Sequence, residues 1–455
     1  MIDWYIILFI ATIIIIYCLD RIVEHHSPYD FFFSKKELGI KQGTVLLCIS
    51  FFSGFSLFIP LFILFSYGLF IGVIFYAVFV LLFFFVIKGY LKGFYQQDKK
   101  NANILYFYKK RFTAKGFKFF LLLLIFANME GLVMQMSVAH KIFQVYFTSH
   151  SIVFVGLILL FSLIIAGLGG LETIYKTGYL ILIICSFSLL FVPLFLYVKA
   201  GTHTIFQAYS LYEATKEISV SKMLLILLSI LIAQIGAFLT NVYSYQVLHS
   251  ISIKYIKSTI KLSLFCYSAV PIALLVYGAY VVSLNQTSLY FTFGYTIFHY
   301  SGKILSIMIV IVWISSIIFS VISSIFALST LLFFCLQMRK GKGLVKIKSI
   351  YFFTIFLCCC MFLLQFIFVK YSMELAIIYG LFYIAASMPL RSVGRKDKRH
   401  SVWLIVYIVF IWGVGMFFAL SMKEFYSGFL IVVAGAIIHF SGGFLLKILK
   451  MNKIT

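Results

Sequence analysis

The chain has 455 residues, of which 63% are hydrophobic and only 11% are charged, and its mean hydropathy is +1.10. Soluble chains contain about 45–50% apolar and about 25% charged residues. The composition therefore excludes a soluble enzyme, a disordered chain and a collagen-like fibre. We expect an all-α polytopic protein in the lipid bilayer of a cell membrane. The frequent Lys, Ile and Phe are typical of an AT-rich bacterial genome.

The formal net charge is +24, with 37 Lys and Arg residues against 13 Asp and Glu. These cations form short clusters between apolar spans, as they do in cytoplasmic loops of membrane proteins. We therefore expect no nucleic-acid partner. The eight cysteines lie in apolar spans without metal-ligand spacing, so we expect reduced thiols and neither a disulfide framework nor a zinc site.

Thirteen stretches approach the ~20 apolar residues that a helix needs to cross a bilayer. They are 2–19, 44–66, 69–88, 117–147, 151–168, 178–198, 223–247, 262–283, 304–337, 350–369, 373–390, 402–421 and 426–446. The first stretch lacks a basic leader and a small-residue cleavage site, so we interpret it as a transmembrane helix and not as a signal peptide.

The basic residues also predict the orientation of the chain. If the N-terminus is outside and the thirteen spans alternate, 30 of the 37 Lys and Arg residues fall in cytoplasmic segments and six fall outside. Cytoplasmic loops are enriched in Lys and Arg, so we expect an N-out, C-in topology. The segment 169–177, which contains Glu172, is then a cytoplasmic turn.

The second span contains the strongest signal for a broken helix. Its small and helix-breaking residues are Ser50, Ser53, Gly54, Ser56 and Pro60. Transporters use broken helices to expose backbone groups to ions and substrates, so we expect Ser53 and Ser56 to bind substrate. The alternative is a proline kink whose serines bond back to their own helix.

The third span, 69–88, is nearly devoid of polar side chains. A sugar would need many hydrogen bonds, because unpaired buried polar groups are costly. A small amphipathic or amine-bearing solute is therefore favoured over a sugar.

The fourth span carries a carboxylate, Glu130, near the middle of the membrane, with Asn128 and Gln135 close in sequence. A bare charge at this depth costs several kcal/mol, so the group must be protonated, paired or in contact with water. Glu130 and Gln135 are candidates for substrate binding, with Glu130 as a counter-charge for an amine or as a proton site. The alternative is a neutral Glu bonded to a neighbouring helix.

The seventh span contains Gln234 and Asn241, which are seven residues apart and share one helix face. This span comes five after the second, as paired broken helices of inverted repeats do. We expect Gln234, Asn241 and Tyr245 to line the substrate cavity. The alternative is that these polar groups serve as hydrogen-bonding contacts between helices.

The ninth span carries Ser316, Ser320 and Ser323 in one stripe at helical spacing. Hydroxyl oxygens suit a hard cation such as Na⁺. Small residues at this spacing are also a common packing face between membrane helices, and the two interpretations have equal weight.

Several segments resemble the sodium/solute symporter family of proline, sugar and pantothenate transporters. The segments are YDFFFSKKEL (29–38), the break at 50–60 followed by YGL (67–69), YFYKKRF (106–112), GGLETIYKT (169–177) and NVYSYQ (241–246). The likeness covers most of residues 25–340, and GGLETIYKT is its most specific part, similar to the family's GGlkAViwTD.

The resemblance implies the leucine-transporter fold, a 5+5 inverted repeat with discontinuous helices. The repeats would be 44–198 and 223–390, with an extra N-terminal helix at 2–19 and two peripheral helices within 402–446.

The resemblance also implies a sodium site. Its ligands would be backbone carbonyls near Ile49 and Phe52 together with Ser316 and Ser320. The sequence departs from the family pattern at Phe319, which replaces a hydroxyl residue, and at Gly178 and Ile322, which replace Asp. Val247 replaces an Arg in the NVYSYQ segment. Because oxygen ligands and charge are lost, the site is degraded, and either Na⁺ or H⁺ remains open as the coupling ion.

These features predict a secondary active transporter that moves a small polar or amine-bearing solute by alternating access. The alternative is a transporter-like solute sensor or partner subunit without ion coupling. The chain shows no nucleophile–base pair, phosphate loop or metal triad, so we expect no enzymatic activity and no cofactor other than the coupling ion.

Overall fold

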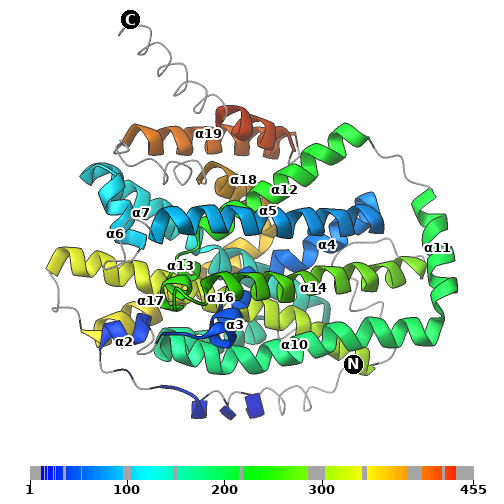
Figure 1. Ribbon diagram of the computed structural model, residues 1–455, viewed down its shortest axis with the longest axis horizontal. Helices are drawn as coiled ribbons and strands as arrows, with labels where there is room; N and C mark the ends of the chain where they lie inside the picture. The colour runs from blue at the N-terminus through cyan, green and yellow to red at the C-terminus, as the bar shows by residue number, and fades with distance from the viewer. Residues whose placement is uncertain are drawn as a thin grey trace, which may run out of the picture. The chain divides into compact units, whose positions relative to one another are not determined.

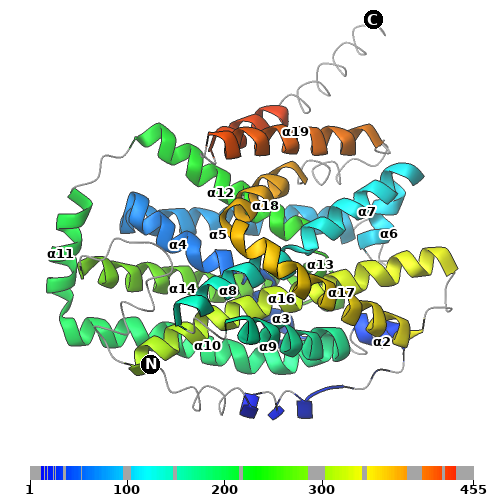
Figure 2. The ribbon, with the colours of Figure 1, turned by 180° about the vertical axis from the view of Figure 1, so that it is seen from behind.

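The computed structural model describes residues 12–14, 16–17, 19–23, 25, 27–33, 37–52, 54–95, 104–146, 151–214, 219–284, 303–340, 346–386, 402–422 and 426–436. The chain forms two compact units, which Figures 1 and 2 show from opposite sides. The first comprises Met1–Lys88, Asn128–Ile218 and Val242–Ser372. The second comprises Gly89–Ala127, Ser219–Asn241 and Met373–Thr455.

Helices account for nearly all of the described chain, and the only strand pairing among these residues is an isolated bridge between Leu38 and Ile251. The helices of the first unit are α2 (Pro28–Phe32), α3 (Ile40–Phe51), α4 (Gly54–Tyr67), π-helix η1 (Gly131–Gln135), α8 (Met136–Tyr146), α9 (Ser151–Ser162), π-helix η2 (Leu163–Leu168), α10 (Gly170–Ala200), α11 (Thr202–Ala214), α13 (Val242–Ser250), α14 (Ile256–Ser283), α16 (Lys303–Lys340), α17 (Ile347–Phe368) and the 3-10 helix η3 (Val369–Tyr371).

The second unit contains fewer helices. They are α6 (Ile104–Arg111), nearly all of α7 (Ala114–Asn128), α12 (Val220–Thr240), nearly all of α18 (Ser372–Ala386), α19 (Val402–Ser421) and the helix Tyr426–Ala436. Helix α5 (Leu69–Tyr95) begins in the first unit and ends in the second.

Among the described residues, nine helices are long and apolar enough to cross a membrane. They coincide with nine of the thirteen predicted spans. Shorter apolar helices lie within three more, at 44–66, 373–390 and 426–446, and most of 2–19 lies outside the described residues. The chain is therefore an all-helical, multi-pass membrane protein, as its composition predicts.

The second predicted span is interrupted, as its serines and glycine indicate. Helix α3 ends at Phe51, and Phe52 is extended, with φ −76° and ψ 124°, before α4 begins at Gly54. Pro60 lies inside α4, so the proline does not make the break. The Ser50 hydroxyl donates to the Leu47 carbonyl of its own helix over 2.7 Å, as expected if the serines of this span bond back to their own helix.

The seventh predicted span is also interrupted, by a single residue. Helix α12 ends at Thr240, Asn241 is extended with φ −76° and ψ 107°, and α13 begins at Val242. The Thr240 hydroxyl lies 3.0 Å from the Gly236 carbonyl oxygen. A hydroxyl that bonds back to its own helix slightly destabilises the helix and often bends it.

The fourth predicted span is not one regular helix. Helix α7 ends at Asn128, and the π-helix η1 separates it from α8. A π-turn widens the helix by one residue and leaves backbone carbonyls without their regular partners. The extra residue of the π-turn rotates the side chains after η1 relative to those before it, while the chain still crosses the membrane.

Helix α10 begins earlier than the sequence predicts, at Gly170 rather than near 178. Glu172 therefore lies in the first helical turn, where it pairs with Lys176 over 3.1 Å, and its predicted place in a turn is wrong. Gly170 has φ +65°, and a methyl group added to it would lie 2.8 Å from the Phe31 carbonyl oxygen. The close approach of the segment around α2 thus requires glycine at this position.

Helix α3 lies at the centre of the first unit. It packs against α10, α13, α14 and α16, and α10 packs in turn against α14 and α16. Large side chains of α16, such as Phe319 and Phe326, are completely buried, whereas Phe187 and Leu190 on α10 are exposed, as residues that face lipid are. The broken helix α3–α4 is therefore surrounded by the longest helices of the unit.

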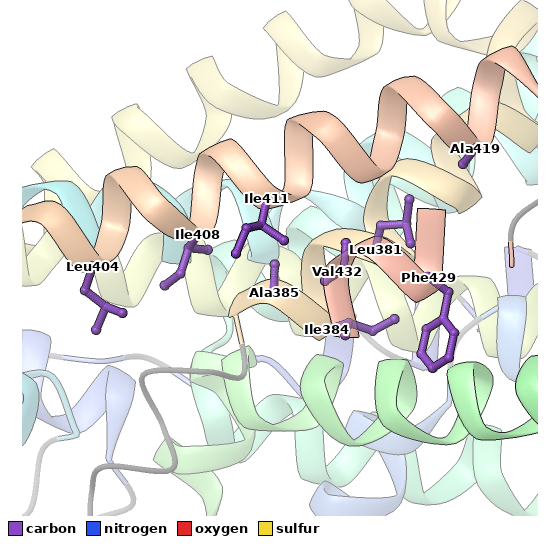
Figure 3. Packing of buried hydrophobic residues seen from close by; sticks show 9 residues of the cluster. All are labelled: Leu381, Ile384, Ala385, Leu404, Ile408, Ile411, Ala419, Phe429 and Val432. Carbon is purple, nitrogen blue, oxygen red and sulfur yellow. The ribbon is translucent and has the colours of Figure 1, made fainter. Parts of the chain in front are cut away.

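The second unit has its own apolar core, which Figure 3 shows. Its members come from α18, α19 and Tyr426–Ala436: Leu381, Ile384, Ala385, Leu404, Ile408, Ile411, Ala419, Phe429 and Val432. Helix α19 and Tyr426–Ala436 approach closely, because a methyl group added to Gly415 would lie 2.6 Å from Val432 Cγ2 and 3.0 Å from the Gly428 carbonyl oxygen. Small residues allow such close packing of membrane helices.

Candidate functional site

The first break places the predicted ligand residues Ile49 and Phe52 at the carboxyl end of α3. Both side chains are buried, and the Phe52 N–H donates to the Cys48 carbonyl over 3.2 Å. Ser53 lies outside the described residues. Ser56 belongs to α4, but its side chain is outside the described set. The predicted substrate contacts of these two serines therefore stay predictions.

Apolar groups lie beside the residues of α3 and α16 at which the resemblance implies sodium. A methyl group added to Gly178 would lie 2.5 Å from Ile49 Cδ1 and 3.9 Å from Phe319 Cε1. The Phe319 ring is fully buried and lies 5.8 Å, centre to centre, from the Phe52 ring. Hard cations need oxygen ligands, and the side chains of Ile49, Gly178 and Phe319 supply none. These three side chains therefore offer a sodium ion nothing, and the predicted ligands, the carbonyls near Ile49 and Phe52 and the hydroxyls of Ser316 and Ser320, stay predictions.

The serine stripe of α16 is buried, and part of it is a packing face. Ser316 and Ser320 are 0% and 5% exposed. A methyl group added to Gly131 would lie 2.5 Å from the Ser320 carbonyl oxygen, and the Gly131 N–H donates to Ser324 Oγ over 3.0 Å. Helix η1 therefore rests against α16, as the small-residue interpretation of the ninth span describes.

Glu130 and Gln135 form a hydrogen-bonded pair across η1. The side-chain amide of Gln135 donates from Nε2 to Glu130 Oε1. Residues five apart face each other here because a π-turn has an i to i+5 repeat. Glu130 is partly exposed, and Gln135 is completely buried. Gln135 Oε1 has no hydrogen-bond partner among the described residues.

A residue that the sequence analysis did not single out, Gln365 on α17, holds η1 in place. Its Nε2 donates to the Leu132 carbonyl over 2.6 Å and lies 3.4 Å from the Val133 carbonyl. The Ser137 hydroxyl lies 3.1 Å from Gln365 Oε1 and 2.6 Å from the Val133 carbonyl, so it can donate to either. The only signal for this role in the sequence is an amide within an otherwise apolar span.

Asn128 connects the fourth span to the second break. Its Oδ1 accepts a hydrogen bond from the backbone N–H of Val242 over 3.1 Å, at the first residue of α13. The Tyr243 hydroxyl donates to the Leu46 carbonyl over 3.2 Å, which ties α13 to α3. Tyr245 is buried in the same short helix. The first unit therefore brings the start of α13, the end of α7 and the middle of α3 together.

Two predicted substrate contacts, Gln234 and Asn241, belong to the second unit. Gln234 lies on α12 and is partly exposed, and its Oε1 has no hydrogen-bond partner among the described residues. Asn241 follows the last residue of α12, and its N–H donates to the Phe238 carbonyl over 3.2 Å. In the same unit, the Tyr383 hydroxyl donates to the Ala127 carbonyl over 3.0 Å, which fixes α18 against the end of α7.

No protein-family model matches this sequence, and no curated protein sequence does either. Among solved structures, the chain is similar to a Na⁺-coupled sialic acid symporter in a substrate-bound, outward-open state. The TM-score is 0.73 and the identity is 15%, and the alignment covers 96% of this chain and 97% of that chain.

Two structures of a manganese transporter from Eremococcus coleocola also align. One is a complex with an aromatic bis-isothiourea substituted compound and the other is a mutant. Each is 13% identical to this chain and covers 95% of it, with TM-scores of 0.43 and 0.46, which support no inference about this chain.

The likeness to the sialic acid symporter extends over nearly the whole of both chains, and at 15% identity it shows the fold alone. The chain is an all-helical membrane protein with a leucine-transporter-like fold. This confirms the general fold that the resemblance to the sodium/solute symporters implies, while the bounds of the two repeats stay predictions.

Proposed function

We propose that this protein is a secondary active transporter that moves a small polar or amine-bearing organic solute by alternating access. The observation that carries the proposal is the pair of interrupted helices. The chain leaves helical geometry at Phe52 and again at Asn241, in spans that are five apart in the predicted order. In lipid, such breaks persist only where other protein or a cavity satisfies the backbone.

The proposal includes a topology. The chain crosses the membrane thirteen times with its N-terminus outside and its C-terminus inside. Residues 44–198 and 223–390 form a 5+5 inverted repeat, with 2–19 and 402–446 peripheral. The charge distribution and the likeness in fold to a symporter support this arrangement.

The solute is proposed to bind beside the two breaks. The proposed contacts are Ser53, Ser56, Glu130, Gln135, Gln234, Asn241 and Tyr245. Glu130 favours a solute that carries an amine, since a carboxylate at membrane depth needs a counter-charge or a proton. The apolar third span disfavours a sugar, although the similar symporter carries sialic acid.

Uptake into proteoliposomes tests the proposal. The probes are radiolabelled choline, L-proline and sialic acid, each with an imposed sodium gradient, an imposed proton gradient or neither. We expect saturable uptake of choline or L-proline above the level of protein-free liposomes, and no uptake of sialic acid. If none of the probes enters, the proposal loses its support.

The second candidate is a transporter-like sensor or partner subunit that binds a solute without ion coupling. The packing of Ile49, Gly178 and Phe319 favours it, because these side chains contribute no oxygen ligand to a sodium ion. In the same liposomes, binding of a labelled probe without entry into the lumen would support this candidate over the transporter.

A further inference from the structure

We propose that Glu130 and Gln135 form a proton-binding site. The side-chain amide of Gln135 forms a hydrogen bond with Glu130 both when Glu130 is ionised and when it is protonated. This inference rests on the proposed transporter and names its coupling ion, a proton. It follows from the geometry of the π-turn, the position of Glu130 within its span and the unpaired oxygen of Gln135.

The π-turn holds the two side chains in register. The backbone carbonyls of Leu132 and Val133 face Gln365 Nε2 at 2.6 Å and 3.4 Å, and the Gly131 N–H is bonded to Ser324. Contacts from two other helices, α16 and α17, therefore satisfy the irregular backbone. Because α16 and α17 both bond to the backbone of η1, they hold the π-turn in place. The π-turn in turn keeps Glu130 and Gln135 in contact.

Glu130 has an unusual place among the carboxylates of the described chain. It lies in the interior of the span Ala114–Gln144, whereas Glu172 and Glu374 lie in the first turns of their helices. It is only partly buried, and the proposal requires that water reaches it there. A carboxylate in this position is stabilised by a proton or a counter-charge.

The contacts of η1 in the described part of the chain bring no counter-charge that the structure records. They include Ser320 and Ser324 on α16 and Gln365 on α17, and none of these side chains is ionised near neutral pH. The first titratable groups further along the same span are His140 and Lys141, about 15 Å away along the helix axis. Glu130 is therefore free to exchange a proton without a fixed ionic partner among these contacts.

Gln135 can bond to either form of the carboxyl group. When Glu130 is ionised, Gln135 Nε2 donates to it, as observed. When Glu130 takes up a proton from water, its O–H becomes a donor. A half-turn of the Gln135 amide then presents Oε1, which has no hydrogen-bond partner among the described residues, as the acceptor. One hydrogen bond between the two side chains is therefore kept in each state.

The packing at the sodium position makes this assignment specific. Ile49, Gly178 and Phe319 bring apolar surface to the place where a symporter of this fold would hold Na⁺. A proton needs no coordination shell, only one basic oxygen. The apolar packing at the sodium position and the Glu130–Gln135 pair are both consistent with a proton, and not sodium, as the coupling ion.

Infrared difference spectroscopy tests the proton site without knowledge of the solute. The full chain in proteoliposomes is moved between alkaline and acidic pH, and the C=O stretch of a protonated carboxylic acid is recorded. We expect this band to appear on acidification, to be lost in Glu130→Gln, to shift in frequency in Glu130→Asp and to persist in the control Glu374→Gln. Equal bands in the wild type and in a folded Glu130→Gln would overturn the proposal, as would a Glu130→Asp band that does not move.

A second variant tests the role of the amide. Gln135→Leu removes both the donor and the acceptor, so the O–H of protonated Glu130 loses its partner, and we expect the frequency of the acid band to change. Gln135→Asn keeps both groups on a shorter arm and should move it less. A band in Gln135→Leu at the wild-type frequency would overturn the two-state role of Gln135.

Flux measurements separate this inference from the proposed function. Uptake of choline or L-proline driven by a proton gradient and abolished in Glu130→Gln supports both. Uptake driven by sodium alone, with no acid band from Glu130, keeps the transporter and overturns the proton site. A titrating Glu130 band in a protein that moves none of the probes keeps the proton site and removes the support for transport.

Discussion

Asn128 Oδ1 accepts a hydrogen bond from the backbone N–H of Val242 over 3.1 Å. The first N–H groups of a helix have no partner within that helix, and Val242 is the first residue of α13. A side chain at the end of α7 thus performs, from a distant part of the chain, the task that a capping residue usually performs from the preceding position. The break at Asn241 is stabilised by a residue of the fourth span.

Removal of this cap should destabilise the start of α13. Loss of a capping oxygen costs about 0.5–2 kcal/mol, so we expect Asn128→Leu to lower the thermal midpoint in detergent and to speed hydrogen exchange of the amides at 242–245. Asn128→Asp keeps the acceptor, and in its protonated form it should leave both closer to the wild type than Asn128→Leu does. Unchanged exchange in Asn128→Leu would show that the cap has no part in holding the break.

The contact between Gly178 and Ile49 gives a direct test of the packing at the sodium position. Overpacking a buried site costs about 1–3 kcal/mol. Because the clashing atom is the tip of the Ile49 side chain, we expect Gly178→Ala to cost about 1 kcal/mol, near the lower end of this range. Thermal unfolding of the purified protein in detergent measures the change.

Ile49→Val provides the matched background, because it removes Cδ1, the atom that lies 2.5 Å from the added methyl group. We expect Gly178→Ala to cost less in Ile49→Val than in the wild type, with a coupling that a double-mutant cycle detects. Equal costs in the two backgrounds would mean that the side chains do not meet.

The sequence predicts the features that depend on composition and on strong helix-breaking residues. Long apolar stretches predict the spans because a membrane leaves few alternatives for the backbone, and the clustered serines and glycine predict an interruption near Phe52. The exact residue is harder to predict, because Pro60, the strongest local signal, is accommodated within α4. Local propensity alone does not determine which of several candidate positions ends the helix.

The candidate site depends more on contacts between distant residues. Glu130 is conspicuous because a carboxylate in an apolar span is costly. Gln365 is not, because its role arises only when α17 meets the irregular carbonyls of Leu132 and Val133. Likewise, the sequence shows that Gly178 and Phe319 depart from a family pattern, but only the packing shows that Ile49 occupies the space that the departure leaves.

In the second unit, the close approach of α19 and Tyr426–Ala436 should make Gly415 intolerant of a side chain. We expect Gly415→Ala to lower the thermal midpoint, by an amount that corresponds to about 1–3 kcal/mol. Gly413 on the same helix is the control, because a methyl group added there has no atom within 4 Å. If Gly413→Ala and Gly415→Ala were equally stable, the two helices would not be packed through Gly415.

His249, at the end of α13, should make stability depend on pH. Burial lowers the pKa of His249 from its ordinary value of 6.5, and its ring lies 5.2 Å from the Phe33 ring. A lowered pKa means that the unfolded chain binds the proton more readily, so stability is lost as pH falls below about 6.5 toward the folded value. We expect the thermal midpoint of the wild type to fall in this range by more than that of His249→Gln. Parallel pH profiles of the two proteins would contradict this assignment.

Thr173 on α10 holds the segment that precedes α2. Its Oγ1 accepts from the Val23 N–H over 3.1 Å and lies 3.4 Å from the Arg21 carbonyl. Thr173→Val keeps the shape and removes the hydroxyl. A hydrogen bond contributes about 1 kcal/mol, so its loss should raise the population of molecules with a detached segment roughly fivefold. We therefore expect trypsin to cleave after Arg21 about fivefold faster. Thr177→Val is the control, because among the described residues the Thr177 hydroxyl bonds to the Thr173 carbonyl of its own helix. Equal cleavage rates in the two variants would show that Thr173 does not retain the segment.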